Sequence, residues 1–241
     1  MNKTISKSWI SAIILSLGFI LAAYVLGQAA VTFKNFNRYV EVRGLDERVV
    51  KSDKAVWNIA FSASDPNLQA TYRYIADSQQ KIINFLKEQG FDEKLVQIQS
   101  ISINEDFYTG NQAGPQENAK PTYRARAGIT LSTNDVDKVV AAVQKTSELV
   151  DVGVIVTEST ASYYYTQLNS IKPEMLAEAT ANAKEAANTF AVNTQSKLAK
   201  IRHASQGVFS ITGADNDNDY NNNSVMKKVR VVTIVQFFLQ D

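Results

Sequence analysis

Three aspartates, Asp215, Asp217 and Asp219, have the spacing in this sequence that is most similar to a metal site. Their alternation matches the first three ligands of a calcium-binding EF-hand loop, which also requires a glycine at its sixth position and a glutamate at its twelfth. Tyr220 and Met226 occupy those two positions. We therefore expect a solvated hairpin tip, because Asn and Asp tolerate turn conformations, and calcium binding is the alternative.

His203 is the single histidine of a chain without cysteine. Metal sites that need two imidazoles are therefore excluded, as are disulfides, thiol catalysis and cysteine-held metals. A hydrolase using His203 as its base would need a nucleophile, and Ser205 lies on the same face of a predicted strand. No G-x-S-x-G sequence and no glycine-rich phosphate loop accompanies them. We predict no catalytic, cofactor-binding or metal-binding residue, and hence no enzyme and no cofactor.

Three adjacent tyrosines, Tyr163, Tyr164 and Tyr165, follow a predicted strand. Three consecutive rings cannot all face one core, so at least one is expected at the surface. It would either anchor an interface, where Tyr is enriched, or cover the sheet of its own domain.

An uncharged apolar run, "WISAIILSLGFILAAYVL", occupies residues 9–26. Eighteen helical residues rise about 27 Å, close to the roughly 30 Å hydrocarbon core of a bilayer. Trp9 and Tyr24 lie near its ends, where amphipathic rings favour the membrane interface. A core helix would carry a polar stripe, and this run has none. The run therefore predicts a membrane segment.

Retention of this segment is the next question. Lys3 and Lys7 precede it as in a secretory signal, and Gly27-Gln28-Ala29 is an acceptable cleavage site. The run nevertheless exceeds the usual signal core of about 7–15 residues, which favours an uncleaved anchor over a removed signal. Basic residues also follow the run, so the positive-inside count does not decide the orientation. These residues are Lys34, Arg38 and Arg43.

The rest of the chain has the composition of a folded protein, with 45% hydrophobic and 20% charged residues. Lys plus Arg number 25 and Asp plus Glu 24, giving a net charge of +1 and no electrostatic reason to expect nucleic acid as a partner. Residues 27–38 are predicted to be a linker. No low-complexity segment divides residues 39–241, so a single domain is expected there.

Hydrophobic periodicity predicts the element order ββαββαβαββ for this domain. Residues 54–63 alternate as a half-buried strand, with Trp57, Ile59 and Phe61 on one face. Residues 54–160 alone give βαββαβ, a split βαβ unit. Strands outnumber helices and hairpins mix with crossovers. This pattern indicates an α+β fold with helices packed on a mainly antiparallel sheet.

Turn and cap residues delimit the predicted helices. Asp65-Pro66 is expected to start the first helix of the domain and Gly90 to end it. Thr133 or Asn134 is expected to cap the second. Two apolar faces are predicted: Leu68, Tyr72, Ile75, Ile82, Ile83 and Leu86 in the first helix, and Met175, Leu176, Ala179, Ala183, Ala186 and Phe190 in the third. The alanines would let a neighbouring element approach closely.

Three stretches, in their order after the apolar N-terminus, resemble the SIMPL-domain family of bacterial envelope proteins. They are "VEVRGLDERVVKSDKAVWNIAFSA", "MLAEATANAKEAANTFA" and "KKVRVVTIVQFF", and the similarity covers residues 39–239. Where many relatives have glycine at the end of the third helix, this chain has Asn193, which can also adopt the left-handed cap. The resemblance implies a periplasmic or membrane-associated protein, ring-like oligomers in some members and a link to oxidative and other stress. It brings no accepted reaction and no catalytic residue.

We therefore expect an anchored, self-associating envelope protein without catalysis, acting in stress tolerance or envelope integrity. Residues 1–8 would be cytoplasmic, residues 9–26 would cross the inner membrane, and residues 39–241 would lie in the periplasm. The partners expected are the inner membrane and further copies of the chain, with no nucleic acid. The alternative is a periplasmic module that binds a small apolar molecule or a peptide between helices and sheet.

Overall fold

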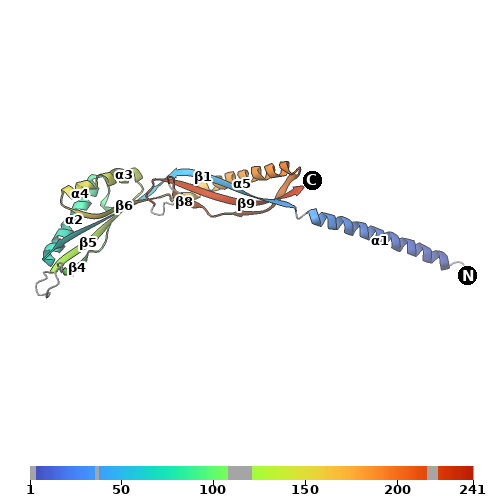
Figure 1. The fold of residues 1–241 in the computed structure, drawn as a ribbon, viewed down its shortest axis with the longest axis horizontal. Coiled ribbons are helices and arrows are strands. Elements are labelled where there is room, and N and C mark those ends of the chain that lie inside the picture. Colours follow the sequence, from blue (N-terminus) through green and yellow to red (C-terminus); the bar gives the residue numbers. More distant parts are fainter. Residues whose placement is uncertain (1–3, 36–37, 108–120, 216–221, 241) are drawn as a thin grey trace, which may run out of the picture. The chain divides into compact units, whose positions relative to one another are not determined.

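The computed structural model describes residues 4–35, 38–107, 121–215 and 222–240 (Figure 1). The chain divides into two compact units. Unit 1 comprises Met1–Glu47, Lys172–Phe209 and Arg230–Asp241, and unit 2 comprises Arg48–Ile171 and Ser210–Val229. Strands β1 (Tyr39–Lys51) and β9 (Met226–Gln240) contribute residues to both units. The division therefore falls inside regular strands, where no linker composition marks it.

Helix α1 (Thr4–Asn35) contains the apolar run and continues through residues 27–35, most of the expected linker. Its segment Ser11–Ala29 has a mean hydropathy of 2.0 and no buried residue. Ser16 donates its hydroxyl to the carbonyl of Ile13 at 2.9 Å, so this polar side chain is satisfied within its own helix. The helix is long and apolar enough to cross a membrane, as an anchor or as a signal sequence.

The sheet of unit 2 has the order β3-β5-β2-β6, with β4 also pairing with β5. Every pairing given for it is antiparallel, and Trp57 lies between Leu131 and Ala161. Strands β2 and β4 therefore run parallel on either side of β5, which confirms the split βαβ unit. The strands are β2 (Lys54–Asp65), β3 (Val96–Ile98), β4 (Ser102–Phe107), β5 (Pro121–Thr133) and β6 (Ile155–Tyr164). Residues 108–120, between β4 and β5, lie outside the described residues.

The core of unit 2 is built where helices pack on one face of this sheet. Trp57, Ile59 and Phe61 of β2 are buried there, as their alternation predicted. The Trp57 ring meets Phe85 of α2 edge-on, with centroids 6.4 Å apart. The helices are α2 (Leu68–Glu88), the 3-10 turn η1 (Glu93–Leu95), α3 (Val136–Gln144) and α4 (Ser147–Asp151). The predicted second helix corresponds to α3, and the short helix α4 follows it.

The ends of α2 and the start of α3 show which cap residues act. Asn67 caps α2 and accepts hydrogen bonds from the backbone of Gln69 and Ala70, whereas Asp65 still belongs to β2. The predicted start at Asp65-Pro66 is therefore two residues early. Gly90 ends α2 with φ +84° and a pair of hydrogen bonds from residues 90 and 91 back to residues 87 and 86, as predicted. The N-cap of α3 is Asp135, not Thr133 or Asn134.

Unit 1 packs helix α5 (Leu168–Asn193) beside a sheet of order β1-β9-β7, where β7 is Lys197–Gln206 (Figure 1). A short strand, β8 (Ser210–Gly213), also pairs with β9. The predicted strand that carries His203 and Ser205 corresponds to β7 and ends at Gln206. Helix α5 and β1 approach so closely that a Cβ on Gly44 would lie 1.8 Å from the carbonyl oxygen of Ala179. The close approach expected from the alanines is therefore present.

The buried side of α5 is a single row at four-residue spacing: Met175, Ala179, Ala183, Ala187 and Ala191. The prediction was right for Met175, Ala179 and Ala183. It was wrong for Phe190, whose side chain is 56% exposed. Rows of i and i+4 residues form a ridge along a helix, and small side chains on that ridge permit close packing. A phenyl ring on the ridge would hold α5 away from the strands.

The left-handed residue after α5 is Gln195, with φ +56°, and not Asn193. Gln195 and Ser196 donate backbone hydrogen bonds to Val192 and Ala191, the same arrangement that ends α2. Asn193 is the last helical residue. The α+β class and the packing of helices on antiparallel sheets are confirmed, while cap positions differ by one or two residues.

Candidate functional site

His203 and Ser205 both lie on β7, opposite Gln236 and Ile234 of β9, and both are exposed. Within the described residues, neither side chain forms a hydrogen bond. A nucleophile and its base need to be within hydrogen-bond reach of each other, with a third group orienting the base. That arrangement is not formed at these two residues in the structure.

The aspartate-rich segment is described only in part. Asp217 and Asp219 lie outside the described residues, so the predicted hairpin tip and the calcium alternative both remain predictions. Asp215 accepts a hydrogen bond from the hydroxyl of Ser224 at 3.3 Å. Among the described residues, no group of three His, Asp or Glu is arranged to hold a metal ion.

The three tyrosines separate as the sequence required. Tyr163 is buried in the core of unit 2, whereas Tyr164 is exposed. Burial raises the pKa of the Tyr163 hydroxyl, because desolvation disfavours the phenolate. Tyr163 thus covers the sheet of its own unit, and Tyr164 remains available to solvent.

Asp53, which the sequence analysis did not single out, gathers a dense set of hydrogen bonds in unit 2. Its carboxylate accepts from the backbone N–H of Thr166 at 2.9 Å, from the Thr166 hydroxyl at 3.0 Å and from the N–H of Gln167 at 3.1 Å. These donors occupy lone pairs that a general base would use. Asp53 therefore fixes the turn between β1 and β2 against the chain that leads into α5.

A polar hollow of about 250 Å³ lies beside this turn, where Lys51 and Ser52 face the start of α3. Lys51 pairs with Asp137 at 2.6 Å and Lys138 with Asp135 at 3.1 Å, so the charges at the hollow cancel. The Ser52 hydroxyl is buried and has no hydrogen-bond partner among the described residues. Because no base accepts its proton in a hydrogen bond there, this hydroxyl is not an activated nucleophile.

Lys227, at the start of β9, is 1% exposed and donates a hydrogen bond to the side-chain oxygen of Asn222 at 3.4 Å. Lysine is almost never fully buried unless it is paired. The sequence carried a signal for this position, because β9 alternates and Lys227 shares its face with Val229 and Val231.

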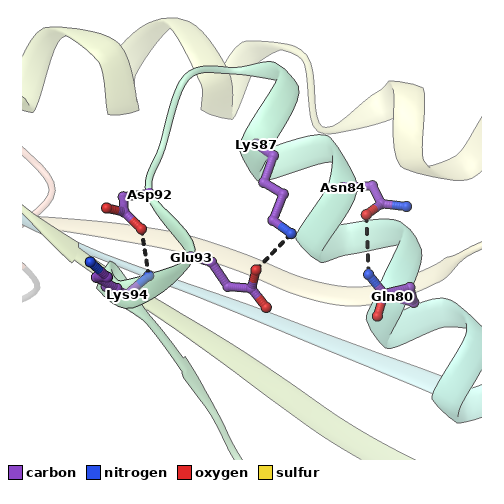
Figure 2. Close-up of polar contacts among 6 residues, drawn as sticks. All are labelled: Gln80, Asn84, Lys87, Asp92, Glu93 and Lys94. Atoms are coloured by element: carbon purple, nitrogen blue, oxygen red, sulfur yellow. Dashed lines mark hydrogen bonds and ion pairs between the residues drawn. The ribbon is translucent and has the colours of Figure 1, made fainter.

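Polar side chains at the end of α2 and in η1 form ion pairs and hydrogen bonds at the surface (Figure 2). Lys87 pairs with Glu93 of η1 at 2.6 Å, and Asp92 accepts from the backbone N–H of Lys94 at 2.9 Å. Both partners of the ion pair are about half exposed, so the pair is worth about 0–1 kcal/mol. These contacts fasten η1 to the helix and are not arranged for catalysis.

An apolar groove of about 580 Å³ opens between α2 and β4. It is lined by Leu68, Gln69, Tyr72, Arg73 and Ile103. Leu68 is 47% and Tyr72 55% exposed, although both were predicted on the buried face of α2. The first turns of α2 therefore leave apolar surface exposed beside the cationic side chain of Arg73. A surface of this kind can bind a small apolar molecule or a peptide side chain.

Comparison with known proteins identifies the family. Residues 40–233 match the family described as "SIMPL: Protein of unknown function (DUF541)", and the chain belongs to this family. No curated protein matches the chain.

Proposed function

We propose that this SIMPL-family protein is an envelope protein that is held in the inner membrane by an uncleaved α1, self-associates and acts without catalysis. The observation that carries the proposal is the segment Ser11–Ala29 of α1, which has a mean hydropathy of 2.0 and no buried residue. Exposed apolar side chains on this scale are costly in water and favourable in lipid.

Retention of the helix is supported by its length. The apolar run exceeds a usual signal core, and α1 continues without a break past the potential cleavage site at residues 27–29. The signal-like N-terminus supports export of the remainder, so residues 39–241 would lie in the periplasm.

The absence of catalysis is proposed because the polar residues that could take part in a reaction lie apart from one another. His203 and Ser205 lie exposed on β7, the Asp53 carboxylate accepts three hydrogen bonds, and Ser52 has no hydrogen-bond partner among the described residues. Self-association and a role in oxidative or general stress tolerance and envelope integrity are supported by the resemblance described above.

Substitution Leu17→Asp tests the anchor. A carboxylate in the middle of the span costs about 2.5–3.5 kcal/mol on insertion scales, so the variant should leave the membrane fraction. Leu95→Asp, on the surface of unit 2, is the matched control and should stay with the membrane. Added protease should digest residues 39–241 in spheroplasts. A soluble mature chain starting at Ala30, or a domain protected from protease, would contradict the proposal.

The mass of the full-length protein in detergent tests self-association. A discrete oligomer is expected, and a monomer at all concentrations would contradict this part of the proposal.

A second candidate function is supported by the apolar groove on α2, namely capture of a small apolar ligand or peptide. Native mass spectrometry of the full chain would show a co-purified ligand. Tyr72→Ala should release it, and Tyr74→Ala, which removes an exposed ring outside the groove lining, should retain it. An unmodified chain mass in every sample would contradict this function.

A further inference from the structure

The ends of four elements, α5, β1, β7 and β9, lie at one end of unit 1. Lys197 and Leu198, at the start of β7, pair with Gln240 and Leu239, at the end of β9. Leu239 donates its backbone N–H to the carbonyl of Arg38, next to the start of β1. The turn that closes α5 leads directly into β7. This group of ends is called the anchor-side end below, because β1 is the first strand after α1.

The part of the anchor-side end that α5 and β7 contribute is basic. Residues 190–206 contain three basic side chains, Lys197, Lys200 and Arg202, and no Asp or Glu. All three are exposed, and within the described residues neither lysine forms an ion pair. The Arg202 guanidinium lies 4.1 Å from the centre of the Tyr39 ring, so its charge reaches the first residue of β1.

Exposed apolar side chains accompany these charges. Phe190 and Val192, in the last turn of α5, are 56% and 69% exposed. Basic residues beside exposed aromatic and aliphatic groups are typical of surfaces that lie in the headgroup region of a membrane. The four-residue spacing of the buried alanines explains why these two side chains are left outside the core of unit 1.

Chain connectivity limits how far this surface can be from a bilayer. The apolar segment ends at Ala29, and the six residues of α1 that follow it rise about 9 Å. At most four residue steps, about 14 Å, then join Asn35 to Tyr39. The start of β1 is therefore tethered within about 23 Å of the end of the apolar segment, and this tether allows the basic side chains to contact the headgroups, where their attraction to anionic lipid acts over roughly 8–10 Å.

We propose that the anchor-side end of unit 1 is a lipid-binding surface, on which Lys197, Lys200 and Arg202 bind anionic headgroups while Phe190 and Val192 enter the interface. This inference rests on the proposed function, since it requires that α1 remains attached. It adds a second membrane contact that would fix unit 1 against the bilayer instead of leaving α1 as its single attachment.

The test uses the full-length protein with a fluorophore on Val192→Cys, a unique thiol because the chain has no cysteine. The protein is placed in nanodiscs of phosphatidylcholine with or without phosphatidylglycerol, containing a lipid with a quencher on its headgroup. Stronger quenching is expected with phosphatidylglycerol. Neutralising the three cations to Gln should lower the ratio of docked to undocked protein by roughly tenfold or more.

Two matched variants isolate the cause. The swap Lys197→Arg, Lys200→Arg and Arg202→Lys keeps the charge and should keep the quenching. Neutralising Lys94, Lys138 and Lys145, which are exposed on unit 2, removes the same charge elsewhere and should leave the quenching unchanged.

Size-exclusion chromatography distinguishes failure of the membrane anchor from failure of the lipid-binding surface. A protein that does not co-elute with the nanodisc lacks a functional anchor, which contradicts both the proposed function and the surface. A protein that co-elutes but is quenched equally in neutral and anionic nanodiscs, or equally in the neutralised variant, overturns the lipid-binding surface alone.

Discussion

The two units build their cores from different materials. In unit 2, the sheet and helices are separated by large side chains, among them Trp57, Phe61 and Leu86, all fully buried. In unit 1, α5 meets β1 through a row of alanines and through Gly44, so backbone approaches backbone. A core filled by bulk should fail when volume is removed, whereas a core that depends on close approach should fail when volume is added.

The largest effect is expected from Trp57→Ala in unit 2. Removing a fully buried indole leaves a cavity and also removes the hydrogen bond that the indole N–H donates to Ser159. The free energy of unfolding should therefore fall by about 3–5 kcal/mol. Hydrogen exchange measured by mass spectrometry would locate the loss in unit 2. A loss spread equally over unit 1 would contradict the separation of the two cores.

Gly44→Ala, which adds a single methyl group in unit 1, should have the next largest effect on stability. The new Cβ would meet the carbonyl oxygen of Ala179, a backbone atom that has no rotamer by which to retreat, so a cost of about 3 kcal/mol is expected. Gly128→Ala is the control, because its Cβ would meet only the flexible end of Gln99. Equal losses in thermal unfolding would show that the close contact of α5 and β1 is not limiting.

Helix ends offer a smaller comparison. The same hydrogen-bond arrangement ends α2 with Gly90 and α5 with Gln195, and both residues have positive φ. Gln195→Gly should therefore stabilise unit 1 by about 0.5–1 kcal/mol, and Gly90→Ala should destabilise unit 2 by a similar amount. Chemical denaturation gives both values, and a destabilising Gln195→Gly would refute the assignment of backbone strain.

The smallest effect concerns pH. Because burial raises the pKa of Tyr163 above its unfolded value of about 10, its contribution to stability is complete below pH 10. That contribution is lost as the pH rises through the folded-state pKa, since the unfolded chain ionises first. Tyr163→Phe should reduce the alkaline loss of stability, and Tyr164→Phe, with an exposed ring, should not. Identical alkaline unfolding curves for all three proteins would contradict this.

Local sequence patterns determined much of this protein, because they are properties of consecutive residues. The apolar run in α1, the buried face of β2, the split βαβ order and the helix end at Gly90 all follow from periodicity or from a single turn residue. The sequence also excluded cysteine chemistry and two-histidine metal sites outright. No catalytic site was predicted from it.

Only the tertiary structure decided which members of each pattern are buried. Apolar residues on one helical side qualify equally by periodicity, but the sheet covers Ala187 and Ala191 and leaves Phe190 exposed. The same holds at the start of α2, where Leu68 and Tyr72 line a groove. Asp53 gains its partners from residues 166 and 167, which are distant in the sequence and fold onto it, and the division into two units falls within continuous strands. Burial and division depend on long-range contacts, which local periodicity does not encode.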